Sequence, residues 1–227
     1  TFLKLVYLYY IKFIFGIKKI KGKNILSTPS NLRLNVALTF NVKPESETFH
    51  DNLPPIQNSS EHEYQLSVDT YAEWDTWETI NAVKDAIEEV HNVTLIEANT
   101  NAYTKLKENK PDIVFNIAEG LNGFNRESQI PAMLDMLQIP YTGSDALTLG
   151  WCLDKSRTKE ILTYHKILNA RFFTAFRLEE FENKEINFPA IVKPVSEGSS
   201  KGIFSSSFVN NPAELRDEVL RIINNYN

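Results

Sequence analysis

The chain reads FPAIVKPVSEGSSKGI over residues 188–203. In this stretch Ile191 and Val192 have the branched apolar side chains that are typical of a buried strand, yet Lys193 follows them directly with a strongly hydrated ammonium group. A proline and a run of small or polar residues then separate this lysine from Ile203, where the apolar pattern resumes. The pattern predicts two strands joined by a loop that has little side-chain bulk.

The residues of this loop suit a phosphate ligand. Its backbone amides are unobstructed because glycine lacks a side chain, and the loop adds two hydroxyls and a positive charge. The candidate phosphate-binding residues are Lys193, Gly198, Ser199, Ser200, Lys201 and Gly202. The loop is not a Walker A motif, since the pattern GxxxxGK[ST] is absent. On composition alone, the alternative is a surface hairpin whose lysine extends its charge into water.

Composition and charge limit the class of protein. The 227 residues are 42% hydrophobic and 11% aromatic, which is enough apolar material for a buried core. The single cysteine, Cys152, excludes an intramolecular disulfide framework and favours a reducing compartment, so we expect a cytoplasmic protein. The formal net charge is -5, and acidic residues predominate after residue 30, which argues against a general nucleic-acid binder.

The first 30 residues differ in character from the rest. They contain six lysines and no acidic residue, and residues 2–20 are rich in apolar and aromatic side chains. The lysines inside this apolar run oppose a membrane-spanning helix. Three readings stay open: an interfacial helix at a membrane, a helix that docks on a partner or a second copy, and an extension without a role. Residues 1–30 are therefore set apart as a basic apolar extension.

Residues 31–150 alternate between strand and helix patterns. The helices have apolar residues at spacings of three and four, and the strands have short apolar runs. At the start of the first helix, we expect Asp75 to be the N-cap and Trp77 to lie on the buried face. The expected order is strand 32–40, helix 74–90, strand 93–98, helix 102–109 and strand 112–118. This order predicts a short parallel sheet in a three-layer α/β domain.

The pattern changes at about residue 150. Before that point we expect a helix over 127–139 and a brief strand over 139–143. After it we expect a helix over 153–167 with Asp154 as N-cap, strands over 172–178, 188–194 and 203–209, and a helix over 211–226 opened by Pro212. Antiparallel strands with a helix behind them predict a second domain over residues 151–227.

Three stretches occur in a recognisable order: PDIVFNIAEG at 111–120, IPYTGSDALTLGWCLDKSRTKEIL at 139–162 and FPAIVKPVSEGSSKGI at 188–203. Together they resemble the successive signatures of the D-alanine-D-alanine ligase-like branch of the ATP-grasp family, over roughly residues 32–227. The resemblance implies an α/β fold: a three-layer, parallel-sheet pre-ATP-grasp domain over residues 31–150, followed by the first α+β lobe of an ATP-grasp domain over 151–227.

The resemblance also implies roles for individual residues. Lys155 matches the family lysine that reaches the nucleotide phosphates, and Lys193 matches the strand lysine that touches them beside the adenine pocket. Ser199 and Ser200 match the flexible loop that closes over the phosphates and the acyl-phosphate intermediate, and they are the candidate catalytic residues. Glu197 occupies the position of the loop glutamate. The other loop residues assigned to nucleotide binding are Gly198, Lys201 and Gly202.

The implied activity is the ATP-dependent joining of a carboxylate to an amine through an acyl phosphate, in cytoplasmic peptidoglycan-precursor chemistry. The implied ligands are ATP, Mg²⁺ and a small amino-acid-like substrate, and dimers are common in such families. The family's magnesium ligands are expected beyond residue 227, so we assign no metal ligand here and expect this chain as given to be inactive. The alternative is a non-catalytic nucleotide-binding or scaffolding protein with an ATP-grasp-derived fold.

Two departures from the family pattern affect the substrate site. LTFNVKPESE stands where a glycine-rich loop is usual, and NIAEGLNGFNRES replaces a histidine-glycine and glycine-glutamate-aspartate-glycine motif. The second replacement brings Glu119, Arg126 and Glu127 to the expected substrate region, where a positive side chain suits a carboxylate. The alternative is that these three residues are solvated loop charges.

Overall fold

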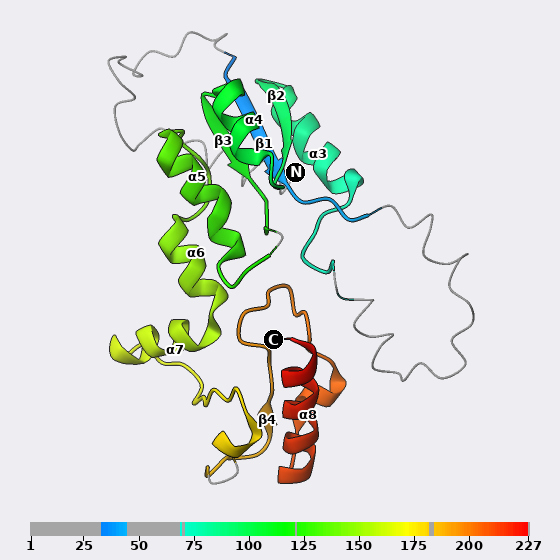
Figure 1. Ribbon diagram of the computed structural model, residues 1–227, viewed down its shortest axis with the longest axis vertical. Helices are drawn as coiled ribbons and strands as arrows, with labels where there is room; N and C mark the ends of the chain where they lie inside the picture. Colours follow the sequence, from blue (N-terminus) through cyan, green and yellow to red (C-terminus); the bar gives the residue numbers. More distant parts are fainter. Residues whose placement is uncertain (1–32, 45–68, 70, 121, 182–183, 227) are drawn as a thin grey trace, which may run out of the picture. The chain divides into compact units, whose positions relative to one another are not determined.

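A computed structural model describes residues 33–44, 69, 71–120, 122–181 and 184–226. The chain divides into two compact units, Thr1–Leu34 and Asn35–Asn227. The extension predicted over residues 1–30 lies outside the described residues, so its membrane contact stays a prediction. All the helices and strands named below belong to the second unit (Figure 1). None of the helices in the described part of the chain has the length and apolar character needed to span a bilayer.

A parallel sheet forms the centre of the first half of this unit. Its strands are β1 (Asn35–Phe40), β2 (Asn92–Glu97) and β3 (Ile113–Asn116), in the order β2-β1-β3. Leu38 of β1 is in register with Leu95 of β2 and Phe115 of β3. A parallel bridge between Val114 and Tyr141 extends the sheet where the sequence predicts a brief strand. The predicted parallel sheet is therefore confirmed.

Alternate residues of the strands pack against helices on opposite faces. Leu38 and Phe40 pack with Ile80 of helix α3 (Trp77–Glu88) on one face. On the other face, helices α4 (Ala102–Asn109) and α5 (Gln129–Leu137) cover the sheet. Residues in that second core include Ala37, Ile96, Val114, Leu106 and Leu134, all with no exposed surface. Burying each of the larger side chains, valine, leucine or isoleucine, contributes about 1.5–3 kcal/mol. The two cores on opposite faces of the sheet give the predicted three-layer arrangement.

The start of α3 differs from the sequence-based expectation in two ways. Thr76 is the N-cap, because its hydroxyl accepts a hydrogen bond from the Thr79 amide at 3.4 Å. Asp75 instead pairs through its main chain with the end of β1, donating to the Asn41 carbonyl at 3.0 Å. Trp77 remains 39% exposed and contacts the Phe40 ring at a centroid distance of 5.5 Å, so it lies at the edge of the core and not within it.

Three helical segments lead from the sheet toward the second half. A short 3-10 helix, η1 (Arg126–Ser128), precedes α5, so the α-helix begins two residues later than predicted. Helix α6 (Ala146–Leu153) was not predicted. Helix α7 (Lys155–Tyr164) begins as predicted, because the Asp154 carboxylate accepts hydrogen bonds from the amides of Ser156 at 2.9 Å and Arg157 at 3.1 Å.

The antiparallel pair of the second half is shorter than predicted. It consists of β4 (Ala190–Ile191) and β5 (Phe208–Val209), with Ala190 opposite Val209, and the 3-10 helix η3 (Ser205–Ser207) occupies part of the strand predicted over 203–209. The strand predicted over 172–178 is wrong. That segment has no strand, and it leads into the 3-10 helix η2 (Leu178–Glu180). Its aromatic residues are partly exposed: Phe172 by 40%, Phe173 by 43% and Phe176 by 63%.

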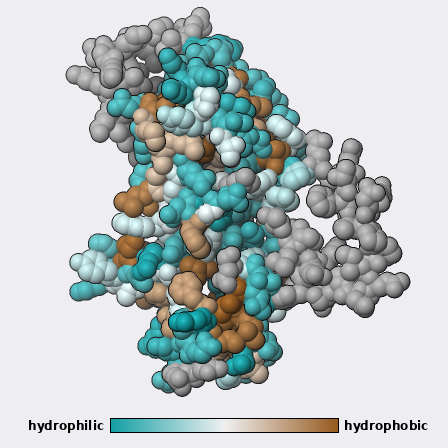
Figure 2. Space-filling view, in the orientation of Figure 1, coloured by the Kyte–Doolittle hydropathy of each residue, from teal (hydrophilic) through white to brown (hydrophobic). Residues whose placement is uncertain are grey.

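Helix α8 (Pro212–Asn225) packs behind this pair. Its N-cap is Asn211, whose side chain accepts hydrogen bonds from the amides of Ala213 at 3.1 Å and Glu214 at 3.0 Å. Val209 of β5 joins Leu215 and Val219 of α8 in a core separate from the two cores of the sheet. Apolar residues also gather on the surface of the region that holds β4 and α8 (Figure 2). A domain boundary at about residue 150 stays a prediction.

Candidate functional site

The glycine-serine loop, residues 196–202, connects β4 to η3 and has a distinctive backbone. Ser199 and Ser200 have φ angles of 44° and 63°, in the left-handed region that side chains disfavour. Both serines are exposed at the tip. Gly202, at the end of the loop, has φ 75°, and a Cβ there would lie 2.5 Å from Cγ of Pro194. Glycine is therefore required at residue 202 by both conformation and space.

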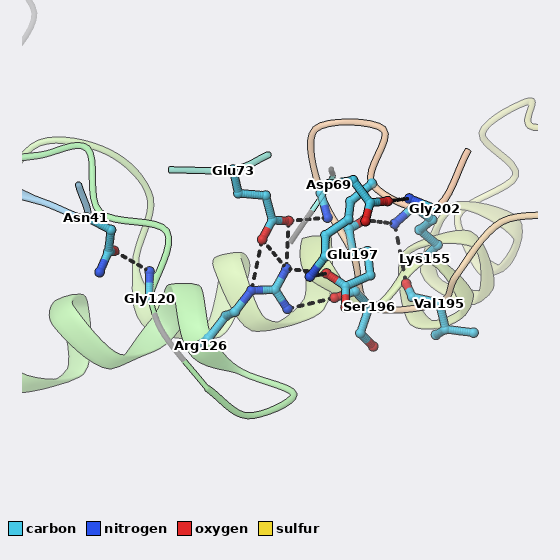
Figure 3. Close-up of polar contacts among 12 residues, drawn as sticks. Asn41, Asp69, Glu73, Gly120, Arg126, Lys155, Val195, Ser196, Glu197 and Gly202 are labelled. Atoms are coloured by element: carbon cyan, nitrogen blue, oxygen red, sulfur yellow. Dashed lines mark hydrogen bonds and ion pairs between the residues drawn. The ribbon is translucent and has the colours of Figure 1, made fainter. Parts of the chain in front are cut away.

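Arg126 is the centre of a buried ion-pair cluster (Figure 3). Its Nη2 lies 2.6 Å from Oε1 and 2.7 Å from Oε2 of Glu73, and its Nε lies 3.2 Å from the same Oε2. Nη2 also donates to Oε2 of Glu197 at 3.1 Å, and Nη1 donates to the carbonyl of Ser196 at 2.8 Å. All three guanidinium nitrogens thus have protein acceptors. The substrate role predicted for Arg126 stays a prediction.

The fold brings Arg126 to this position through the turn that follows β3. The side chain of Asn41 at the end of β1 donates to the carbonyl of Ala98 at 3.1 Å and accepts from the amide of Gly120 at 2.8 Å. A Cβ on Gly120 would lie 2.3 Å from the carbonyl oxygen of Arg126, so only glycine permits this approach. Asn41 and Gly120 therefore fix the turn from which Arg126 reaches Glu73.

Glu197 accepts hydrogen bonds from three cationic side chains. Its carboxylate accepts from Arg126 at 3.1 Å and from Nζ of Lys201 at 3.0 Å. Its main-chain carbonyl accepts a hydrogen bond from Nζ of Lys155. Because the side chain of Glu197 is only 18% exposed, these contacts are partly shielded from water. The loop glutamate predicted from the family resemblance therefore links Arg126, Lys155 and Lys201.

Lys155 and Lys193 both line one cleft beside this loop. Lys155 is the first residue of α7, and its amide donates to the carbonyl of Val195 at 3.0 Å. Burial lowers the pKa of Lys155, the nearby charge of Glu197 opposes that change, and the positive charge of Lys193 lowers it further. Lys193 itself is exposed. Two lysines from segments nearly 40 residues apart in the chain therefore act electrostatically on the same space.

A cleft of about 2140 Å³ runs past these lysines. Lys155, Lys193, Glu197 and Lys201 line it together with apolar residues. The apolar wall includes Phe172, Phe173, Ile191, Val219 and Ile222. Such a space, lined by cations and by an aromatic and aliphatic wall, has the chemistry to take a ligand with a charged tail and a flat apolar body.

A smaller hollow of about 560 Å³ lies next to the carboxyl ends of the sheet strands. Its lining includes Lys43, Glu73, Trp74, Asp75, Glu119 and Ser199. Ser199 therefore lines this hollow, whereas Lys155, Lys193 and Lys201 line the larger cleft. The candidate site thus consists of two spaces with the loop between them.

Two carboxyl groups near the glycine-serine loop, Glu119 and Glu127, have raised pKa values, and Glu119 lines the hollow. Burial raises the pKa of Glu119 to about 7, the negative charges of Glu127 and Glu73 raise it further, and Arg126 opposes the change. Burial also raises the pKa of Glu127. A carboxyl group with a pKa near 7 exchanges a proton readily at neutral pH. Glu119 can therefore hold or release a proton beside the loop.

The sequence did not identify four residues that complete the cluster. Glu73 and Asp69 precede α3, where no motif marks them, and Arg221 and Tyr226 lie on or after α8. Oδ2 of Asp69 accepts from the amide of Gly202 at 2.8 Å and from the hydroxyl of Tyr226 at 2.7 Å. These contacts join residues more than 130 positions apart, and no local sequence pattern reports such a pairing. Among the described residues, no group of three or more His, Cys, Asp or Glu could hold a metal ion.

Several known proteins are similar in sequence to part of this chain. The chain is 35% identical over 147 residues to D-alanine-D-alanine ligase of Aquifex aeolicus, an alignment that covers 64% of this chain and 49% of the ligase. The chain is a relative of the D-alanine-D-alanine ligases. It is also 32% identical over 162 residues to an uncharacterised protein, y4sG, of Sinorhizobium fredii, covering 67% of this chain and 47% of that protein. The family resemblance seen in the three motifs is thereby confirmed.

The fold agrees with this relationship. A crystal structure of the D-alanine-D-alanine ligase from Bacillus anthracis matches 84% of this chain and 54% of the ligase, with a TM-score of 0.54 and 23% sequence identity. The chain spans about half the length of the ligases that it matches. No protein-family model matches it. The α/β architecture predicted from the sequence is therefore that of the D-alanine-D-alanine ligases over the matched region.

Proposed function

We propose that the protein functions as an ATP-dependent ligase that joins a carboxylate to an amine through an acyl phosphate, as a D-alanine-D-alanine ligase does. The observation that carries this proposal is the meeting of Lys155 and Lys193 beside the glycine-serine loop in one large cleft. Phosphoryl transfer needs cations and amide donors around the transferred group, because negative charge concentrates there. The names of the relatives support the same chemistry.

The residues present fit the phosphates of ATP. Lys155 supplies an ammonium that is partly removed from water, and Lys193 supplies an exposed one, so their charges together suit a polyphosphate. Gly198 and the exposed Ser199 and Ser200 supply amides and hydroxyls at the loop tip. ATP, with Mg²⁺, supplies the phosphoryl group that activates the substrate carboxylate.

The smaller hollow suits the amino-acid-like substrate. Glu119 lines it, and its raised pKa of about 7 suits the transfer of a proton from an attacking amine. Ser199 lines the same hollow, and it therefore lies between the proposed substrate and the phosphates. We further propose cytoplasmic peptidoglycan-precursor chemistry as the setting, by extension from the named relatives.

Phosphate release tests the proposal. The natural full-length protein, incubated with ATP, Mg²⁺ and single D-amino acids, should release phosphate at a rate that depends on the amino acid. The matched control is the same protein with Lys193→Ala, which should release phosphate more slowly at subsaturating ATP. Binding of ATP without amine-dependent phosphate release, for every amino acid tried, would contradict the ligase and favour a nucleotide-binding protein without catalysis.

A further inference from the structure

Each end of the glycine-serine loop is held by an arginine from another part of the chain. At the first end, Arg126 donates to the carbonyl of Ser196 at 2.8 Å and to the carboxylate of Glu197 at 3.1 Å. At the second end, Nη2 of Arg221 donates to the carbonyl of Gly202 at 2.7 Å. Arg126 belongs to η1 and Arg221 to α8, so both anchors are outside the loop that they hold.

Each arginine also has a buried carboxylate partner. The side chains of Arg126 and Glu73 are 10% and 5% exposed, and those of Arg221 and Glu218 are 10% and 4% exposed. Nη2 of Arg221 lies 2.6 Å from Oε1 of Glu218. Breaking either pair would leave a charge buried without compensation, so both arginines are fixed before any ligand arrives. We call Arg126 with Glu73 the first clamp, and Arg221 with Glu218 the second clamp.

Among the contacts described, no side chain from outside the loop holds the tip, residues 199–201, whereas the Gly198 amide before it donates to Glu73 of the first clamp. The amide of Lys201 donates to the carbonyl of Gly198 at 2.8 Å, and the amide of Ile203 donates to the carbonyl of Ser200 at 3.0 Å. The tip therefore forms two consecutive turns. Ser199 and Ser200 are exposed and adopt the left-handed backbone. A folded, exposed turn can change conformation while the two ends stay in place.

We propose that Arg126 is a positioning residue that holds the first end of the loop, and that loop closure on a ligand is confined to the tip, residues 199–201. All three nitrogens of Arg126 already have protein acceptors, so a substrate carboxylate would have to displace a buried one. Arg126 acts through Glu197, whose carbonyl and carboxylate also bind Lys155 and Lys201. The inference rests on the proposed function only for the identity of the ligand, a nucleotide phosphate.

Amide hydrogen exchange measured by NMR tests the clamps separately. The Gly198 amide donates to Glu73 in the first clamp, whereas the Gly202 amide donates to Asp69 beside the second. In Arg126→Met, exchange at Gly198 should become roughly tenfold faster or more, with Gly202 unchanged. In Arg221→Met, the change should appear at Gly202 and not at Gly198. Arg177→Met, which removes an exposed ion pair with Glu180, should change neither glycine.

A milder variant keeps the test valid if Arg126→Met does not fold. Glu197→Ala removes the contact of Arg126 with the loop side chain and leaves the pair with Glu73 in place. It should also accelerate exchange at Gly198, by less than Arg126→Met. Unchanged exchange at Gly198 in a folded variant would overturn the proposal. So would equal acceleration of both glycines in both arginine variants, because the loop would then open as one unit.

ATP affinity separates a positioning role from a purely structural one. By calorimetry with Mg²⁺ and ATP, Glu197→Ala should weaken binding several-fold at an unchanged thermal midpoint. An unchanged dissociation constant for ATP, with loss of amino-acid binding in Arg126→Lys, would make Arg126 a substrate ligand and overturn the proposal. Failure of the wild-type chain to bind ATP would count against the proposed function. The hydrogen-exchange rates of Gly198 and Gly202 would then be the test of whether the two arginines hold the ends of the loop.

Discussion

The Arg126 guanidinium and the Glu73 carboxylate form a two-point pair, with Nη2 2.6 Å from Oε1 and Nε 3.2 Å from Oε2. The two residues are 53 positions apart, and both side chains are at most 10% exposed. The pair joins the segment before α3 to the turn after β3. Because the same arginine reaches Ser196 and Glu197, the position of the glycine-serine loop depends on this pair.

Loss of Arg126 should therefore be costly for stability. Arg126→Ala leaves Glu73 buried without a cation, and we expect the free energy of unfolding to fall by about 3–5 kcal/mol. Arg157→Ala is the matched control, since the side chains of Arg157 and Glu160 are 63% and 51% exposed. That change should cost less than about 1 kcal/mol. Urea unfolding at neutral pH measures both, and equal losses in the two variants would contradict the clamp.

Lys193 should affect ATP binding and not folding. The residue is exposed, so Lys193→Ala removes little packing. A hydrogen bond between charged groups contributes about 1.5–3 kcal/mol, so ATP affinity should fall roughly tenfold or more. Lys107→Ala, which removes an exposed lysine from α4, is the control for the change in net charge. Calorimetry with Mg²⁺ and ATP gives the two affinities. Equal affinity in the two variants would reject the role of Lys193.

Local sequence patterns predicted the elements whose causes are local. The order of strand and helix patterns predicted the parallel sheet, and Asp154 was predicted as a cap; its carboxylate accepts hydrogen bonds from the amides two and three residues later. The two lysines and the loop were predicted as one site because family motifs mark them. Each of these features depends on neighbours within a few positions, or on a motif of known order.

Features that depend on distant neighbours were not predicted. The segment 172–178 has the aromatic content of a strand, but no strand pairs with it in the described part of the chain. Trp77 follows the helical spacing of the core residues, yet as the first residue of α3 it lies at the edge of the core. The pair of Arg126 and Glu73 had no sequence signal, because opposite charges 53 positions apart are common in any chain.

Glu119 should make stability depend on pH. Burial raises its pKa from an ordinary value of 4.5 to about 7, so between these pH values the folded protein keeps a proton that the unfolded chain has lost. Protons then favour folding, and the free energy of unfolding should fall as pH rises from about 4.5 to 7. Glu119→Gln should flatten this part of the profile. Thermal unfolding at a series of pH values measures it, and an unchanged slope would contradict the assignment.

Gly202 should tolerate no side chain. Gly202→Ala places a Cβ 2.5 Å from Pro194 in a left-handed backbone, and we expect a loss of roughly 1–3 kcal/mol or more. Gly143→Ala is the control, because Gly143 has φ 97° but no atom within 4 Å of the added Cβ. It should suffer only the backbone cost, of roughly 1–2 kcal/mol. Chemical denaturation gives the free energy of unfolding of both variants. A larger loss in Gly143→Ala than in Gly202→Ala would contradict the prediction.

The central claim is that the glycine-serine loop, with Lys155 and Lys193, binds nucleotide phosphates. The most direct measurement is an NMR titration that follows the amide signals of Gly198 and Gly202 with Mg²⁺ and ATP, and separately with adenosine. We predict large, saturable shifts of the Gly198 signal with ATP, smaller shifts at Gly202, and little change at either glycine with adenosine. Equal shifts with both ligands, or none with ATP, would contradict the claim.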